Sequence, residues 1–218
     1  MNLRIVFLCV FILPSAAAAQ SSSRGDRWEF YLSPVWTASK DYSFEGGSTA
    51  ETDTGFGWTL GFAKNLNPQL ALGFELGWGQ ADYRATVAGG TGNLGNAVNV
   101  NSEIETWTTR FFGTYYLFPG RFAPFVSGGL GWTYIDTNIP SGPPQGICWY
   151  YPWYGQVCET YVPTQTTTKF SYNAALGLRY DFSPGFVRGL VNTQYVDFGG
   201  SYGSTYWTQY RIDFGVKF

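Results

Sequence analysis

The sequence predicts an all-β fold: an eight-stranded antiparallel up-and-down transmembrane β-barrel that follows a cleavable N-terminal signal peptide. Three observations lead to this prediction. Large apolar residues alternate with small, polar or charged residues in segment after segment. The connections between these segments are alternately short and long, as in transmembrane barrels. Aromatic residues make up 20% of the 218 residues, whereas charged residues reach only 13%, about half the share of an ordinary soluble domain.

The N-terminal residues 1–19 are expected to be a secretory signal peptide. Arg4 provides a basic start, Ile5 to Leu13 are apolar, and small residues follow up to Ala19. Because the apolar stretch is too short to span a bilayer, cleavage after Ala19 is favoured over a membrane anchor. Residues 20–26 would then form a short periplasmic segment, and 27–218 the barrel domain. The integrin-type tripeptide Arg24-Gly25-Asp26 would face the periplasm and is interpreted as a chance match.

Eight strands are predicted from the alternation of period two. In the second strand, Phe56, Trp58 and Leu60 alternate with glycine and threonine, and the third, sixth and last strands repeat this pattern. Trp207 has the parity of the barrel interior, so either it lies above the membrane or the register shifts there. The predicted strands are Trp28–Thr37, Gly55–Asn65, Gln69–Tyr83, Glu105–Phe118, Phe122–Asn138, Phe170–Phe182, Phe186–Phe198 and Tyr206–Phe218.

The connections supply an independent test of the barrel. Tight turns are expected at 65–68, 119–121 and 183–185, and long loops at 38–54, 84–104 and 139–166, with a shorter outer loop at 199–204. An even number of strands places both termini at the end with the short turns, which is the periplasmic side of a bacterial barrel.

The orientation of the alternation separates a membrane barrel from a soluble calycin-like barrel. A soluble barrel would have to fit the aromatic residues into one narrow lumen, whereas small residues and paired charges suit an eight-stranded interior. The alternate strand positions that hold the small residues also hold nine charged residues, namely Glu29, Glu75, Arg110, Arg179, Asp181, Arg188, Arg211, Asp213 and Lys217.

Those charges are expected to form a network of ion pairs, because an isolated buried charge costs several kcal/mol. Glu75 with Arg110, and Arg179 or Arg211 near Asp181 and Asp213, are the candidate partners. A charged constriction in a small pore is the functional alternative.

The absence of histidine rules out Ser-His-Asp and Cys-His catalysis and histidine-ligated zinc. A net charge of -2 without a basic cluster excludes a nucleic-acid partner. No catalytic residue, cofactor or metal site is expected.

Cys148 and Cys158 are expected to form a disulfide, because an exported protein meets an oxidising compartment. The loop that they close should project outward and is rich in aromatic residues, which suit contact with an extracellular ligand or host surface. The alternatives are packing over the barrel mouth or on the lipid interface. The aromatic residues in question are Trp149, Tyr150, Tyr151, Trp153 and Tyr154.

The chain resembles the small eight-stranded outer-membrane β-barrel superfamily, which includes outer membrane protein A-type, outer membrane protein W-like and opacity-protein-like barrels. The C-terminal strand carries the most specific part of this resemblance. It looks like the assembly signal of the superfamily, formed by Tyr210, Ile212, Phe214, Val216 and the terminal Phe218. The resemblance implies outer-membrane lipid as the environment and folding by the outer-membrane assembly machinery.

Three functions follow as hypotheses. The preferred one is an integral outer-membrane protein with a structural or surface-interaction role and no catalysis. The alternative, suggested by the outer membrane protein W-like barrels, is a narrow channel for small or hydrophobic solutes. A third class, membrane-embedded hydrolases or acyltransferases that act on lipid A, is disfavoured because those families rely on histidine and this chain has none.

Overall fold

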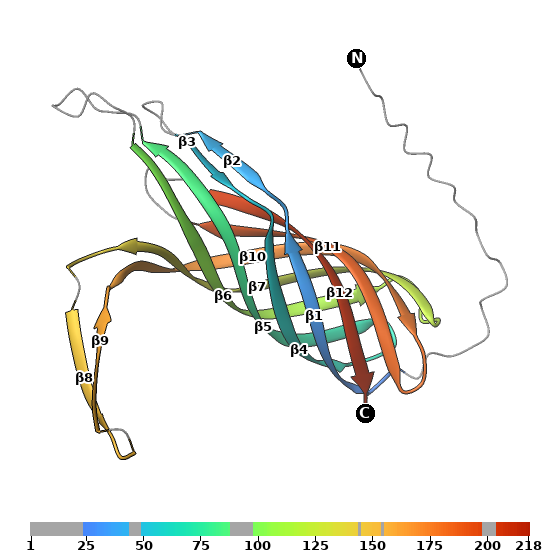
Figure 1. Cartoon of the computed structure of the whole chain (residues 1–218). Helices are drawn as coiled ribbons and strands as arrows, with labels where there is room; N and C mark the ends of the chain where they lie inside the picture. The colour runs from blue at the N-terminus through green and yellow to red at the C-terminus, as the bar shows by residue number, and fades with distance from the viewer. Residues whose placement is uncertain (1–23, 44–48, 88–97, 144, 154, 198–203) are drawn as a thin grey trace.

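The computed structural model, which describes residues 24–43, 49–87, 98–143, 145–153, 155–197 and 204–218, is a closed antiparallel β-barrel (Figure 1). Each of its eight barrel strands pairs with the next, and β1 pairs with β12 to close the barrel. No helix in the described residues is long and apolar enough to cross a membrane. The barrel strands are β1 (Trp28–Thr37), β4 (Gly55–Asn65), β5 (Leu70–Val87), β6 (Val98–Tyr116), β7 (Phe122–Pro140), β10 (Thr164–Asp181), β11 (Gly185–Asp197) and β12 (Ser204–Lys217).

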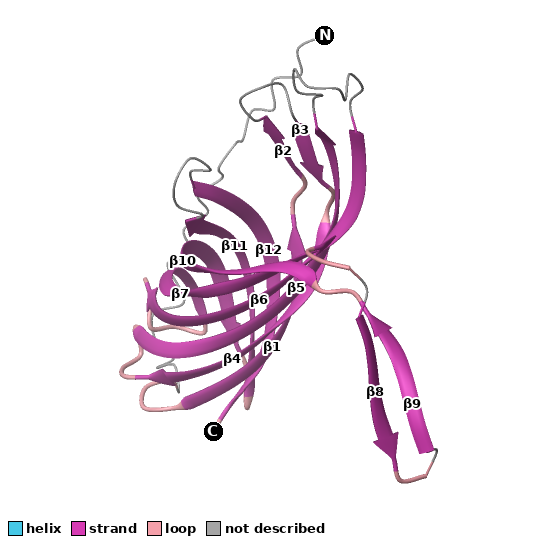
Figure 2. Ribbon diagram, turned by 90° about the vertical axis from the view of Figure 1, so that its left-hand side faces the viewer, coloured by secondary structure: helices cyan, strands magenta, loops and turns pink. Residues whose placement is uncertain are grey.

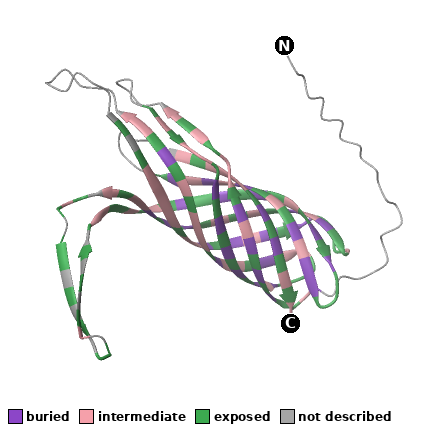
Figure 3. Ribbon diagram, viewed as in Figure 1, coloured by how far each residue is buried: buried purple, intermediate pink, exposed green. Residues whose placement is uncertain are grey.

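Burial alternates along the barrel strands as the sequence predicts. In β4 the side chains of Phe56, Trp58 and Leu60 are each 42% exposed on the outer wall, whereas Thr59 between them is buried. Figure 3 shows the same alternation of buried and exposed positions around the barrel. The large apolar side chains therefore lie outside and the small or polar ones inside, the inverse of a soluble barrel.

The ends of the barrel differ as expected. Residues 66–69, 117–121 and 182–184 make short connections at one end, called here the turn end. Both termini of the barrel lie there, because Trp28 and Phe218 exchange two backbone hydrogen bonds of 2.9 and 3.0 Å. The opposite end, which carries the longer connections, is called the loop end.

The loop-end connections differ from the prediction, because parts of them are strands. The segment expected as a loop at 38–54 contains β2 (Lys40–Ser43) and β3 (Thr49–Thr52), and the one at 139–166 contains β8 (Gln145–Tyr151) and β9 (Gly155–Tyr161). Several barrel strands also continue beyond their predicted ends. Beyond the membrane a strand needs no apolar face, so period-two counting of large apolar residues misses it.

The barrel rim splits where these extensions begin. Pairing between β6 and β7 ends at Glu105 and Asp136, while β6 continues along β5 as far as Val98. Strands β8 and β9 form a separate two-stranded sheet, which stands apart from the barrel (Figure 2).

Three tryptophan rings on the outer wall near the loop end form what is called here the aromatic girdle. Trp58, Trp78 and Trp107 occupy directly paired positions on β4, β5 and β6. The indole groups of Trp78 and Trp107 both donate to Glu105, at 2.6 and 3.0 Å. Indole rings with a satisfied N–H are typical of the membrane interface, so this girdle marks the outer boundary of the apolar band.

Trp207 keeps the parity of the interior. The pairing of β11 with β12 continues without a shift through Gln194 and Trp207. The indole N–H of Trp207 donates to the hydroxyl of Tyr42 at 2.9 Å. The register therefore does not slip, and Trp207 lines the loop end of the lumen.

Candidate functional site: the barrel lumen

Two groups of charged side chains cross the lumen. The first, called the central cluster, consists of Glu75, Arg110, Arg188, Arg211 and Asp213. Arg110 donates to Glu75 through Nε at 3.0 Å and also through Nη2. Arg211 lies between both carboxylates, 2.9 Å from Glu75 and 3.0 Å from Asp213. Arg188 binds Asp213 at 2.8 Å, so each cation of this cluster has a carboxylate partner.

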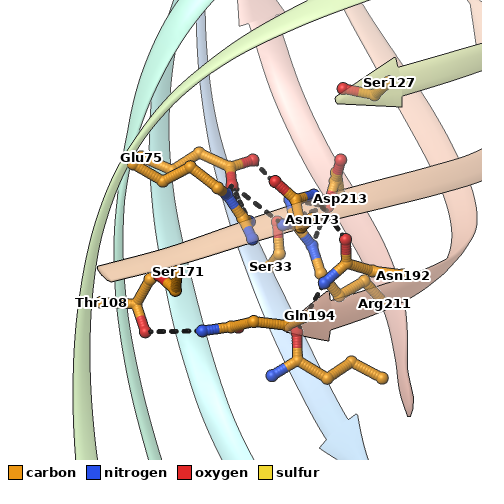
Figure 4. A network of polar contacts seen from close by, with 12 residues as sticks. Ser33, Glu75, Thr108, Ser127, Ser171, Asn173, Asn192, Gln194, Arg211 and Asp213 are labelled. Atoms are coloured by element: carbon orange, nitrogen blue, oxygen red, sulfur yellow. Dashed lines mark hydrogen bonds and ion pairs between the residues drawn. The ribbon is translucent and has the colours of Figure 1, made fainter. Parts of the chain in front are cut away.

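Hydroxyl groups donate further hydrogen bonds to the carboxylates of Glu75 and Asp213. Tyr31 donates to Glu75 at 2.5 Å, and Ser33 donates to Asp213 at 2.6 Å. Figure 4 shows Ser33, Glu75, Arg211 and Asp213 meeting in the lumen. Because charged groups this deeply buried are stable only when paired and hydrogen-bonded, the cluster cross-links β1, β5, β6, β11 and β12 from inside.

The second group, called the turn-end cluster, consists of Arg24, Glu29, Arg179, Asp181 and Lys217. Arg179 binds both oxygens of Glu29, at 2.6 and 2.8 Å. It also donates to Asp181 at 2.8 and 3.1 Å, and Lys217 contacts the same carboxylate at 2.9 Å. The planar guanidinium suits two such forked contacts, which a lysine could not make.

Arg24 is a member of this cluster that sequence reasoning missed. It precedes β1, yet its side chain is fully buried in the turn end of the barrel. Nη2 donates to the carbonyls of Phe118 and Gly120 at 3.1 and 2.7 Å, and Nε lies 3.2 Å from Asp181. The guanidinium also stacks 4.4 Å from the ring of Tyr116. The Arg24-Gly25-Asp26 tripeptide thus has a structural role.

A tight turn directs Arg24 inward. The backbone N–H of Arg27 donates to the carbonyl of Arg24 at 3.2 Å, and Asp26 adopts a positive φ of 57°. Asp26 pairs with Lys64 at 2.6 Å on the surface. The hydrogen bond from Lys64 lowers the pKa of Asp26 below its ordinary value.

Replacing Arg24 with alanine is expected to lower the free energy of unfolding by about 1–3 kcal/mol, because two carbonyls and a carboxylate lose a charged donor. Urea unfolding of the refolded protein in lipid vesicles measures this change. Arg27→Ala is the matched control, since Arg27 is exposed in the same turn. Equal stabilities of the two variants would refute a stabilising role of Arg24.

An aromatic layer separates the two clusters. Tyr31, Phe112 and Phe186 pack together, with ring centroids of Tyr31 at 6.4 and 6.3 Å from the other two. Tyr31 lies against Gly61 of β4, where an added Cβ would clash with the ring. Glycine on the inner wall thus makes room for rings that fill the narrow lumen.

Neutral polar side chains form a layer on the loop side of the central cluster. Gln194 donates to Thr133 at 2.8 Å. Gln194 also donates to Thr108 at 3.4 Å, and Asn173 donates to Asn192 at 2.6 Å (Figure 4). A cavity of about 70 Å³ at the loop end runs beside this layer, with walls that include Gln209 and reach Glu75 and Arg110 of the central cluster. Such a cavity has room for a few water molecules.

All nine charged residues predicted to face the lumen lie in these two clusters, and Glu75 with Arg110 is among the ion pairs. The described residues of the two clusters hold six cationic side chains and four carboxylates, an excess of two positive charges. No described group of three or more His, Cys, Asp or Glu side chains could hold a metal ion. Sequence reasoning also missed Tyr31 and Ser33, because an isolated hydroxyl on a strand gives no signal of its partner.

The C-terminal strand presents its apolar residues to the outside. Phe214 is 55% exposed and Phe218 57% exposed on the outer wall. Tyr210, Ile212 and Val216 share this orientation, while the alternate residues of β12 point into the lumen.

The disulfide joins Cys148 and Cys158, which face each other in the β8–β9 hairpin. Tyr150 and Trp153 are 75% and 85% exposed. Trp149 and Tyr151 belong to β8, and Tyr154 lies outside the described residues.

Reduction of this disulfide is expected to leave the unfolding midpoint of the barrel unchanged, because the hairpin forms its own sheet. Urea unfolding with and without reductant, and of a Cys148→Ser/Cys158→Ser variant, measures this independence. A lower midpoint after reduction would show that the hairpin stabilises the barrel.

Comparisons with known proteins agree with this architecture. The family model described as "Outer membrane protein beta-barrel domain" matches residues 5–218. No curated protein matches the sequence. Among solved structures, Neisserial surface protein A is 11% identical with a TM-score of 0.52, covering 87% of this chain and 97% of its own. The outer membrane protein OprG of Pseudomonas aeruginosa is 14% identical with a TM-score of 0.52, covering 91% and 98%. At these identities the structures support the fold alone.

Proposed function

This chain belongs to the outer membrane protein β-barrel family, and we propose that its role in the bacterial outer membrane is structural or a surface interaction, without catalysis. The barrel anchors the chain in outer-membrane lipid, and the strands beyond the loop end contact other molecules. An extracellular ligand or a host surface is the class of partner that these strands would meet. Residues 1–19 would act as the signal peptide that exports the chain; they lie outside the described residues.

The obstruction of the lumen by the two charged clusters and the aromatic layer is the observation that carries this proposal. Beyond the loop-end cavity, a solute would meet the central cluster, the aromatic layer and the turn-end cluster. Tyr31, Arg179 and Phe186 are fully buried, and Arg188 is 3% exposed. A continuous pathway would require buried ion pairs to separate, at a cost of several kcal/mol. The same pairing supports a non-catalytic role, because Glu75 and Asp213 are already bound by arginines.

Uptake of small solutes tests the closed lumen. Liposomes that contain the refolded protein are expected to swell no faster in isosmotic solutions of small sugars or amino acids than protein-free liposomes. Swelling faster than this background would show that the lumen passes solutes, and would favour transport over the structural role.

A narrow channel is the second candidate, and the cavity of about 70 Å³ at the loop end favours it. If the clusters rearranged to admit ions, the excess of two positive charges would attract anions into a low-dielectric pore. Any conductance should therefore prefer chloride over potassium, as the reversal potential in a salt gradient would reveal.

The outer-membrane assembly machinery is the second proposed partner, recognised through the C-terminal strand. The outward apolar side chains from Tyr210 to Phe218 support this proposal. Removal of the aromatic ring in Phe218→Ala should reduce the amount of folded protein in the outer membrane of cells. The same variant should refold in detergent like the wild type, since refolding in vitro bypasses the machinery. A normal amount in cells would contradict this role.

A further inference from the structure

In the part of the chain that the structure describes, no barrel strand pairs with the β8–β9 hairpin. It forms a separate sheet, and its side chains at Tyr150 and Trp153 are 75% and 85% exposed. We propose that the tip of this hairpin binds the lipid surface of the surrounding membrane, in the outer-leaflet interface beside the barrel. This inference rests on the proposed function and makes it more specific, since the hairpin would act as a second, lateral membrane contact.

The position of the hairpin points to this occupant. In both views β8 and β9 run sideways and back from the loop end, away from the barrel axis (Figures 1 and 2). A hairpin that served as a lid would instead lie over the barrel mouth. Its tip is therefore directed toward the region occupied by lipid around the barrel.

The lengths of the strands agree with this placement. From Trp132, whose exposed ring lies on the outer wall, β7 continues to Pro140, a distance of about 26 Å along the strand. Strand tilt shortens the corresponding height above the membrane. The seven residues of β8 run back over about 23 Å, enough to return Trp153 to the level of the girdle.

The chemistry of the hairpin also favours a lipid interface. Its sequence from Gln145 to Tyr161 is rich in tryptophan and tyrosine, and Glu159 is its single charged residue. Tryptophan and tyrosine prefer the boundary between hydrocarbon and water, where the ring is apolar and its N–H or O–H stays hydrated. The near absence of charge removes the main cost of entering that boundary.

The disulfide would preorganise this contact. A two-stranded hairpin is at best marginally stable in water, and Cys148 and Cys158 link its strands at directly paired positions. The aromatic tip is thus held in one shape before it meets lipid, which reduces the entropy lost on binding.

Quenching of Trp153 fluorescence by lipid tests the proposal. The refolded protein and its Trp153→Phe variant are placed in phosphatidylcholine vesicles, with and without lipids brominated close to the headgroup. The difference between the two emissions isolates Trp153. Most of this difference is expected to disappear in brominated vesicles, while aqueous acrylamide should quench it weakly.

Two further variants calibrate the measurement. The emission lost in Trp107→Phe comes from a girdle ring on the outer wall, and brominated lipid should quench that emission. The emission lost in Trp207→Phe comes from a ring in the loop-end cavity, and brominated lipid should leave it unchanged. Emission from Trp153 that survives in brominated vesicles and is quenched by acrylamide would place the tip in water and overturn the proposal. The closed lumen is tested separately by solute uptake. The lipid contact of the hairpin can therefore be disproved without disproving the closed lumen, and the reverse also holds.

Discussion

Replacing Glu75 with glutamine is expected to lower the free energy of unfolding by about 3–5 kcal/mol. Glutamine keeps the shape of the side chain but removes its charge, which leaves Arg110 without its carboxylate and Arg211 with Asp213 alone. Urea unfolding in lipid vesicles, followed by tryptophan emission, measures the loss.

An exposed ion pair is the control for this substitution. Arg84 and Asp53 form a contact of 3.1 Å, with side chains 64% and 39% exposed. Arg84→Gln should change the free energy of unfolding by no more than about 0.5 kcal/mol, because solvent screens the pair. If Glu75→Gln were as mild as this control, the central cluster would not be a stabilising element.

Replacing Arg179 with methionine is expected to have an effect of the same size, about 3–5 kcal/mol. Methionine fills a similar volume, but Glu29 then loses both hydrogen bonds from Arg179 and keeps one from Asn65 at 2.7 Å. Asp181 retains Lys217 and Arg24. The buried charge on Glu29 is therefore the main cause of the expected loss.

Neutralising that carboxylate should recover part of the stability. The double variant Glu29→Gln/Arg179→Met is expected to be less destabilised than the sum of the single variants, with a coupling energy of about 0.5–3 kcal/mol. Strictly additive losses in the same urea experiment would show that the two side chains do not depend on each other in the folded state.

The barrel was predictable because one physical constraint applies to every membrane-spanning strand. Hydrocarbon outside and a narrow interior require large apolar residues to alternate with small or polar ones, and β1 and β4 have the predicted bounds. Once a strand leaves the membrane this constraint ends. Strands β2, β3, β8 and β9 therefore gave no sufficient pattern and were expected as loops.

The sequence predicts which charged residues line the lumen better than it predicts which of them pair with each other. The parity of a charged residue shows that it faces inward, but its partners depend on the stagger between strands. Glu75 and Arg110 sit opposite each other on adjacent strands, so this pair could be anticipated. Arg179 and Glu29 meet across the lumen from strands far apart in the sequence, and Arg24 belongs to no strand. Only the folded barrel brings these groups together.

Single-channel recording in planar bilayers tests the closed lumen most directly. The refolded protein, inserted in its folded state, is predicted to give no stable conductance steps, because the two ion clusters and the aromatic layer fill the path between the cavity and the turn end. Long-lived steps of uniform size would contradict this account, and a preference of those steps for anions would identify the arginine-rich lumen as their pathway.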